Sequence, residues 1–153
     1  MNRIADLLSP AHVAVGVDAA SKRDLFATVA GLFEASGGIA RASVVDALTA
    51  REKLGSTGLG QGIAIPHGRI RGLRDARGAF VRLAQPIPFD APDGRPVSQV
   101  FVLLVPEQAT EQHLELLSEL AQMFSERGFR ERLAAAPDAA AAWSAIRDWA
   151  PVA

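Results

Sequence analysis

Residues 97–105, Val-Ser-Gln-Val-Phe-Val-Leu-Leu-Val, decide the fold class of this chain. The run is apolar from Val100 onward and rich in β-branched residues, which predicts a central strand covered on both faces. Residues 78–83 form a second apolar run of the same kind. Between the two runs, Asp90–Pro96 is dense in turn-forming residues, so we expect a hairpin-like excursion there.

Two helices are predicted before these strands. Ser21 has the spacing of an N-cap with Asp24 in the first helical turn, and apolar residues then recur at helical intervals as far as Gly37. A second helix is expected to start at residues 41–43 and to stop by Gly55.

Three more helices are predicted after the strands. We expect Thr110 to cap a long amphipathic helix that ends near Gly128. Residues 129–135 and 137–149 continue as helical segments. Strands mixed with helices in this order predict an α/β fold in which residues 1–153 form one domain, with a mixed β-sheet flanked by helices on both faces.

Composition excludes several classes of protein. A chain of 153 residues, 49% of them hydrophobic, can bury one sizeable core. A net charge of −1 gives little reason to expect nucleic-acid or membrane-surface binding. The absence of cysteine excludes disulfides, thiolate metal sites and cysteine nucleophiles, and fits a reducing compartment. No segment has the roughly 20 apolar residues of a membrane span, so we expect a cytoplasmic protein that is not embedded in a membrane.

A glycine-rich segment, Gly55 to Arg69, is the candidate site: Gly-Ser-Thr-Gly-Leu-Gly-Gln-Gly-Ile-Ala-Ile-Pro-His-Gly-Arg. Its first eight residues include four glycines, which allow tight turns and let backbone N–H groups approach a ligand. The apolar run 62–65 predicts a buried strand that ends at Pro66. His67 would then be presented at the end of the strand, where a loop begins.

Familiar site patterns do not fit this segment. A P-loop needs Gly-Lys-Ser/Thr, but Ile63 follows Gly62, and the glycine spacing does not match the dinucleotide fingerprint. Ser56 lacks the glycine two positions earlier that a hydrolase nucleophile elbow needs. The histidines lack the spacing of a helical metal motif. A metal site built from His67, His113 and a carboxylate is therefore less favoured than a site without metal or cofactor.

What remains is a histidine among backbone amides and arginines, a combination that suits a phosphoryl group. Neutral imidazole is a competent nucleophile because its ordinary pKa is about 6.5. Guanidinium and N–H groups would neutralise the phosphate. The arginines nearest in sequence are Arg51, Arg69 and Arg71.

Each of these residues also has a simpler interpretation. A histidine after a strand is often a turn residue, and His113 in the first turn of a helix suits a packing or surface role as well as a chemical one. We interpret His12 as structural. The arginines at positions 69, 71, 74 and 77 form either a solvated charged face or a docking patch for an acidic partner.

The segment Arg51–Arg69 closely resembles the phosphorylation-site signature of the fructose/mannitol family of enzyme IIA proteins, from the bacterial phosphoenolpyruvate-dependent phosphotransferase system. The similarity extends through residues 86–91, 93–97 and the His113-Leu pair, and so covers nearly the whole chain. The chain length and the opening segment 4–10 are most similar to the nitrogen-regulatory branch of this family.

The resemblance implies roles for particular residues. His67 would be the phosphoacceptor, using Nε2 to receive phosphate from a histidine phosphocarrier protein, and Arg51 and His113 would be the supporting arginine and second histidine. Amides of the Ser56, Thr57 and Gly58 loop would help to bind phosphate oxygens. The family fold is a mixed sheet between helices.

Two functions follow from the resemblance. In the first, the protein is a phosphoryl carrier whose phosphorylation state controls regulatory protein targets. In the second, it is a sugar-specific component that passes phosphate to a IIB unit during fructose- or mannitol-type uptake. A pure binding module is a third alternative, and the intact set of Arg51, His67 and His113 argues against it.

Overall fold

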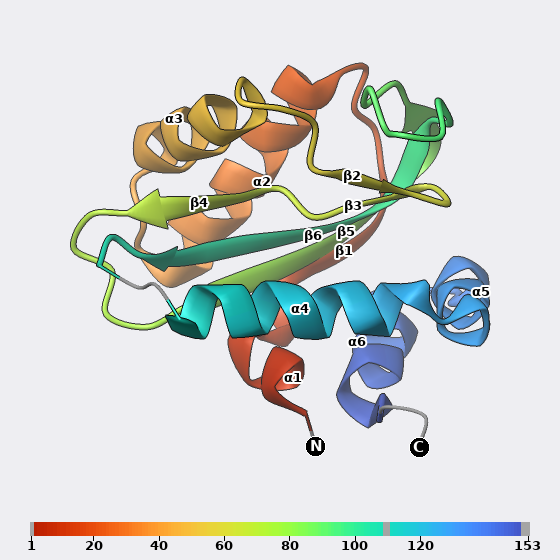
Figure 1. Ribbon diagram of the computed structural model, residues 1–153. Helices are drawn as coiled ribbons and strands as arrows, with labels where there is room; N and C mark the ends of the chain where they lie inside the picture. The colour runs from red at the N-terminus through yellow and green to blue at the C-terminus, as the bar shows by residue number, and fades with distance from the viewer. Residues whose placement is uncertain (1, 109–110, 151–153) are drawn as a thin grey trace.

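A computed structural model describes residues 2–108 and 111–150. Across these residues the chain forms one sheet with the strand order β1-β5-β6-β3-β2, in which β4 also pairs with β6 (Figure 1). The strands are β1 (Val13–Val17), β2 (Gly58–Gly60), β3 (Ile63–Ala64), β4 (His67–Ile70), β5 (Arg77–Ile87) and β6 (Val97–Pro106). Strand β6 pairs antiparallel with β5 and parallel with β3 and β4. The predicted mixed sheet is therefore confirmed.

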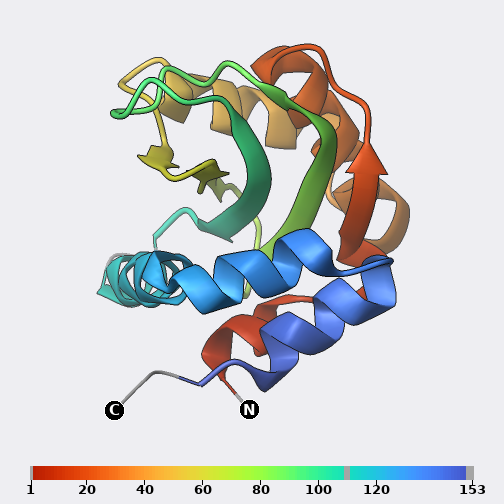
Figure 2. The same cartoon turned by 90° about the vertical axis from the view of Figure 1, so that its right-hand side faces the viewer.

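Helices cover both faces of this sheet, as predicted (Figures 1 and 2). One face is covered by α2 (Lys22–Gly37) and α3 (Arg41–Glu52), and the other by α1, α4, α5 and α6. The bounds on the second face are α1 (Arg3–Leu7), α4 (Glu111–Ser125), α5 (Arg127–Ala135) and α6 (Ala139–Asp148), and a 3-10 turn, η1 (Pro10–His12), follows α1. No helix in the described part of the chain is long and apolar enough to cross a lipid bilayer.

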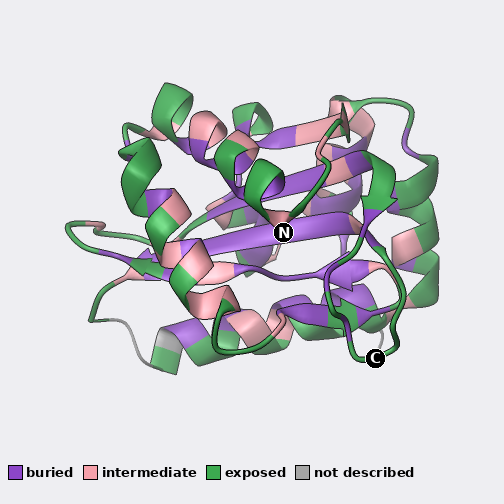
Figure 3. Cartoon of the chain, turned by 90° about the horizontal axis from the view of Figure 1, so that it is seen from above, coloured by how far each residue is buried: buried purple, intermediate pink, exposed green. Residues whose placement is uncertain are grey.

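Strand β6 contributes to the hydrophobic cores on both faces of the sheet. The central strands are accordingly coloured as buried over most of their length in Figure 3. Phe101, Leu103 and Val105 face the core under α4, whereas Val102 and Leu104 face the core under α2 and α3. All five side chains are at most 1% exposed. Successive strand residues point to opposite faces, so a continuous apolar run is what a strand between two helical layers requires.

The N-terminal helix boundaries match the sequence prediction. The Ser21 hydroxyl accepts a hydrogen bond from the Asp24 N–H at 3.2 Å, as an N-cap does. Gly38 ends α2 in the left-handed region with φ 68°, a conformation that favours glycine. The predicted second helix is α3, which begins at Arg41 and ends at Glu52.

Two C-terminal boundaries differ from the prediction. Gly128 lies inside α5 rather than at the end of α4, which stops at Ser125. Pro137 precedes the last helix rather than opening it, because Asp138 is the N-cap and accepts from the Ala141 N–H at 2.8 Å. Thr110, the predicted cap of α4, lies outside the described residues.

The placement of His67 corrects another prediction. His67 opens strand β4 and pairs with Leu103, instead of starting a loop. Pro66 interrupts the predicted strand because it has no N–H to donate, so β3 ends at Ala64. The Pro66 carbonyl still accepts from the Leu103 N–H at 3.0 Å, which keeps the chain beside β6 until pairing resumes.

Gly68, the residue after His67, allows α3 to pack closely on β4. A Cβ atom at Gly68 would lie 2.9 Å from the Cβ of Ala47 and 3.1 Å from the Ala47 carbonyl carbon, both too close for van der Waals contact. We expect Gly68→Ala to lower the free energy of unfolding by about 1–3 kcal/mol, because α3 must shift to admit the methyl group. Urea unfolding of the purified variant measures this change.

Gly128→Ala is the matched control for that substitution. A Cβ atom at Gly128 would meet nothing within 4 Å, and the residue lies in helix α5. Alanine is favoured over glycine in a helix by up to about 1 kcal/mol, so this variant should be as stable as the wild type or more so. Equal stability of Gly68→Ala and the wild type would contradict the close packing of α3 on β4.

Candidate functional site

The hydrogen bonds of His67 define one tautomer of its ring. Nδ1 lies 2.9 Å from the carbonyl oxygen of Ile65, which can only accept, so Nδ1 carries the proton. Nε2 lies 3.2 Å from Nε of Arg51, which can only donate, so Nε2 carries the lone pair. Both contacts therefore indicate a neutral imidazole whose nucleophilic nitrogen is Nε2.

Arg51 reaches His67 from the last turn of α3. Its Nη1 donates to the carbonyl oxygen of Gly55 at 2.9 Å, which orients the guanidinium while Nε faces His67. A guanidinium with further N–H donors beside Nε2 can bind the oxygens of an anionic group on that atom.

His113 completes the group from the first turn of α4. Its ring lies edge-on to that of His67, with centroids 5.3 Å apart and an interplanar angle of 80°. The side chain is buried, with 9% of the residue exposed. The structure thus brings together Arg51, His67 and His113, which the sequence separates by up to 62 positions (113 − 51).

The surroundings favour neutral histidines at this site. Burial, together with the positive charge of Arg51, lowers the pKa of His67 below its ordinary value, and the hydrogen bond to Ile65 and the negative charge of Glu52 oppose this effect. Burial is also the main cause that lowers the pKa of His113, and His67, Arg69 and Arg51 add to it. The physical reason is that a buried cation loses hydration, and neighbouring cations repel it.

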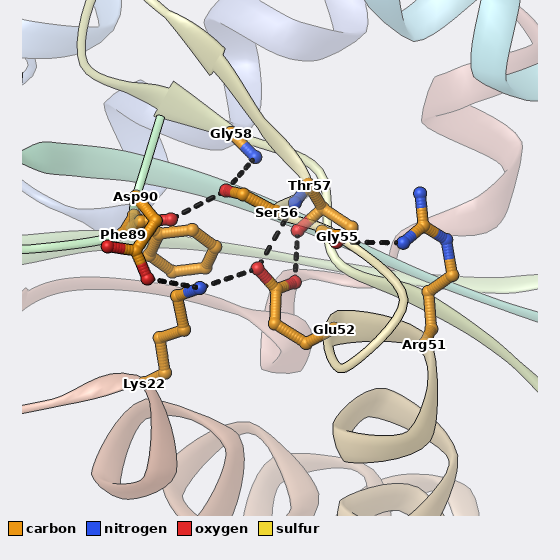
Figure 4. Close-up of polar contacts among 9 residues, drawn as sticks. All are labelled: Lys22, Arg51, Glu52, Gly55, Ser56, Thr57, Gly58, Phe89 and Asp90. Atoms are coloured by element: carbon orange, nitrogen blue, oxygen red, sulfur yellow. Dashed lines mark hydrogen bonds and ion pairs between the residues drawn. The ribbon is translucent and has the colours of Figure 1, made fainter. Parts of the chain in front are cut away.

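The loop after α3 makes several internal hydrogen bonds (Figure 4). Thr57 donates its N–H and its hydroxyl to the carboxylate of Glu52, the Gly58 N–H donates to the Ser56 hydroxyl, and that hydroxyl donates to the carbonyl of Phe89. The backbone donors of Thr57 and Gly58 that we expected to bind phosphate are therefore already engaged, with Glu52 of α3 and with Ser56. Their role in phosphate binding stays a prediction, and it requires these bonds to rearrange.

Sequence reasoning missed two charged residues beside this loop. Glu52 is buried, with 7% of its side chain exposed, and Lys22 of α2 donates to it at 2.8 Å. Lys22 also lies 3.7 Å from the carboxylate of Asp90 and 4.6 Å from the ring centroid of Phe89. The position of Glu52 next to Arg51 in the sequence could have marked Glu52 as a site residue. Lys22 gave no such signal, because it lies 30 positions away from Glu52.

The remaining sequence candidates lie apart from this group or at its edge. His12 is 4% exposed, contacts the ring of Phe33 and hydrogen-bonds the hydroxyl of Ser36, which fits its structural interpretation. The arginines at positions 69, 71, 74 and 77 are exposed, and Arg69 donates to the carbonyl of Glu107. Within residues 2–108 and 111–150, no three histidine or acidic side chains cluster as metal ligands would.

The lowered pKa values predict how the histidines titrate. In the folded protein, the imidazoles of His12, His67 and His113 should titrate below about 6.5, chiefly because burial disfavours the charged ring. The unfolded chain then binds more protons than the folded chain at pH values below about 6.5. The stabilisation from neutral burial is complete above that pH and is lost as the pH falls through the folded pKa values.

Two measurements check this prediction. NMR titration of the ring protons should give midpoints below those of the same protein in concentrated urea, and urea unfolding should show a lower free energy of unfolding at pH 5 than at pH 7. Midpoints equal to those in urea would contradict burial as the dominant cause.

Comparison with known proteins assigns the class. The profile of the family described as the phosphoenolpyruvate-dependent sugar phosphotransferase system, EIIA 2, matches residues 6–149, and the chain belongs to this family. It is 43% identical to a nitrogen regulatory protein of Pseudomonas aeruginosa, over 97% of each chain.

Solved structures agree with this assignment. The crystal structure of the nitrogen regulatory protein IIA-Ntr from Neisseria meningitidis superposes with a TM-score of 0.89 at 47% identity, covering 95% of this chain and 99% of that one. Enzyme IIA of the mannitol system of Escherichia coli, solved in complex with phosphorylated enzyme IIB, shares the fold with a TM-score of 0.76 at 20% identity, over 93% of this chain and 98% of that one.

Proposed function

We propose that this protein is a phosphoryl carrier in which Nε2 of His67 accepts phosphate from a phosphohistidine carrier protein. The observation that carries the proposal is the pair of contacts to the His67 ring: Ile65 holds the proton on Nδ1, and Arg51 faces the lone pair on Nε2. A nucleophile that is already neutral and oriented needs no separate base.

Transfer of the phosphoryl group to His67 is a single displacement. The bond between phosphorus and the donor nitrogen breaks, the donor ring recovers its electron pair, and the Nε2 lone pair of His67 forms the new bond to phosphorus. The His67 ring gains positive character, which the hydrogen bond from Nδ1 to the Ile65 carbonyl stabilises. In-line phosphoryl transfer depends mainly on such positioning and on charge stabilisation.

Arg51 and His113 support the charge of the transferred group. In the free site the Arg51 guanidinium occupies the direction from which phosphorus must approach Nε2. We infer that this guanidinium moves from the nitrogen to the phosphoryl oxygens as the new bond forms. We further propose that His113, whose ring lies edge-on to that of His67 and whose pKa is lowered by burial, donates a hydrogen bond to the same group.

Exposed leucines adjoin the site and suit a protein partner. Leu54 is 84% exposed just after Arg51, and Leu114 is 68% exposed beside His113. Apolar side chains around a charged centre favour docking of a folded carrier, because they can be buried in the complex while the phosphoryl group passes between the rings. We place this exchange in the cytoplasm, in line with the absence of cysteine.

Of the two downstream roles, we propose regulation of protein targets rather than delivery to a sugar transporter. The supporting observation is full-length similarity to proteins named for nitrogen regulation, at 43% and 47% identity. The mannitol enzyme IIA, solved in complex with phosphorylated enzyme IIB, represents the transport alternative, but at 20% identity it shares only the fold with this chain. Loss of uptake of one sugar in a deletion strain would favour the transport alternative.

The chemistry is tested by a labelling reaction. The wild-type protein is incubated with phosphoenolpyruvate, the first enzyme of the system and the phosphocarrier, and the product is examined by phosphorus and nitrogen NMR. We expect one acid-labile phosphate, bonded to Nε2 of His67. Failure to incorporate phosphate, or phosphate on Nδ1, would overturn the proposal.

A further inference from the structure

We infer that Glu52 and Thr57 are positioning residues: their hydrogen-bonded pair holds the two carbonyl groups that orient His67 and Arg51. This inference rests on the proposed phosphoryl transfer at His67. Neither residue is hydrogen-bonded to the His67 ring among the contacts of the described residues. Instead, a chain of hydrogen bonds leads from Glu52 to each ring nitrogen.

The first step is the clamp between α3 and the following loop (Figure 4). Oε1 of Glu52 accepts from the Thr57 hydroxyl at 2.6 Å, and Oε2 accepts from the Thr57 N–H at 3.1 Å. The Glu52 side chain is 7% exposed and Thr57 is 6% exposed. Two charge-assisted hydrogen bonds in a buried setting fix both the side chain and the backbone of Thr57.

The second step leads from Thr57 to Nδ1 of His67. The Thr57 carbonyl accepts from the Ile65 N–H at 3.0 Å, and the Ile65 carbonyl accepts from Nδ1 at 2.9 Å. The residue that Glu52 clamps therefore positions the acceptor that keeps the proton on Nδ1. A histidine is commonly oriented in this way by the partner of the nitrogen that does not react.

The third step leads to Nε2. Gly55, two residues before Thr57, presents its carbonyl to Nη1 of Arg51 at 2.9 Å, while Nε of the same guanidinium lies 3.2 Å from Nε2. Gly55 lies between Glu52 and Thr57, and its N–H donates to the Glu52 carbonyl at 3.2 Å, so the paired residues fix both ends of the segment that carries its carbonyl.

Lys22 explains why a carboxylate can be buried here. Its ammonium group lies 2.8 Å from Oε2 of Glu52 and so offsets the cost of burying a negative charge. Lys22 comes from α2, whereas Glu52 ends α3, so the clamp also ties the loop to both helices of this layer.

Two substitutions test the inference. Thr57→Val keeps the shape of the side chain but removes the hydroxyl. Glu52→Gln removes the negative charge and leaves one acceptor oxygen for the Thr57 N–H and Lys22, while its amino group cannot accept from the Thr57 hydroxyl. We expect nitrogen NMR of the imidazole to change from one predominant tautomer, with the proton on Nδ1, to a mixture. With the phosphocarrier as substrate, kcat should fall by about tenfold with little change in KM, because orientation rather than docking is affected.

Controls separate positioning from general damage. Thr57→Ser keeps the hydroxyl and should restore both the tautomer and kcat. Glu34→Gln removes the same charge from an exposed ion pair with Arg41 and should leave both readouts unchanged. Thermal unfolding shows whether each variant is folded. If Thr57→Val does not fold, Glu52→Gln alone provides the test.

The outcomes distinguish this inference from the proposed function. A wild-type tautomer in both variants, with kcat either unchanged or reduced, would overturn the positioning role, because only an effect on the ring orientation supports it. If the wild-type protein accepts no phosphate, the proposed function fails, while the tautomer measurement still decides whether Glu52 and Thr57 orient the ring.

Discussion

His67→Gln should reduce phosphate incorporation from the phosphocarrier below detection. Glutamine offers an amide oxygen to Arg51 but has no basic nitrogen to form a bond to phosphorus. No other histidine is placed to substitute within the described site: His113 lies beside His67, but its Nε2 and Nδ1 lack the pair of contacts, from Ile65 and Arg51, that orient the acceptor. The measurement is acid-labile phosphate bound after incubation with the complete donor system.

Two variants control for indirect effects of that substitution. His12→Gln replaces a buried histidine in contact with Phe33, away from the site, and the folded variant should incorporate phosphate at the wild-type level. His113→Gln should retain incorporation at a reduced rate, because we propose that His113 supports the transferred group without forming a covalent bond to it. Full incorporation by His67→Gln would show that another atom is the acceptor.

The sequence predicted the layers of the fold because those elements carry strong local signals. The apolar run of β6 requires burial on both faces, and Ser21 with Asp24 marks a helix start, so neither depends on distant partners. Strand β4 was missed because its four residues, His-Gly-Arg-Ile, have little strand character. Parallel pairing with β6 and the contact of Gly68 with Ala47 produce this strand, and both are tertiary interactions.

The same distinction applies to the candidate site. Glycines, a histidine and an arginine within 17 positions (51–67) indicated anion chemistry, and the family resemblance added His113. The ion pair of the partly buried Lys22 with Glu52 gives no such signal, because charged residues are most often solvated and these two lie on different helices. Only the folded chain shows that Glu52 holds the loop instead of facing solvent.

The contact between Glu52 and Thr57 changes the interpretation of the glycine-rich loop. The sequence suggested a cradle of free amides for phosphate, but the Thr57 N–H donates to Glu52 of α3 and the Gly58 N–H donates to Ser56. A loop held in this way acts first as a support for the Arg51 guanidinium through the Gly55 carbonyl. Under the proposed function, the main anion-binding group of the site is the side chain of Arg51 from α3, so we expect its removal to be a severe change.

Arg51→Met should slow phosphoryl transfer by about 10²–10³-fold, the effect typical of removing a donor that stabilises developing charge. Methionine keeps much of the length and apolar stem of arginine but removes every N–H donor and the charge. Stability should change little, because Arg51 is only partly buried and its hydrogen bonds are to Gly55 and His67. Single-turnover transfer from the phosphorylated carrier measures the rate directly.

The geometry of the guanidinium, in addition to its charge, is tested by Arg51→Lys. Lysine restores a positive charge but cannot contact the Gly55 carbonyl and Nε2 of His67 with two donors in a fixed plane, so its rate should lie between those of methionine and the wild type. Loss of the cation should also raise the pKa of His67 in Arg51→Met, because Arg51 contributes to lowering it. Arg71→Met, which removes an exposed arginine beyond β4, is the matched control. Equal transfer rates for Arg51→Met and Arg71→Met would mean that the guanidinium orients the free site without stabilising the transferred group.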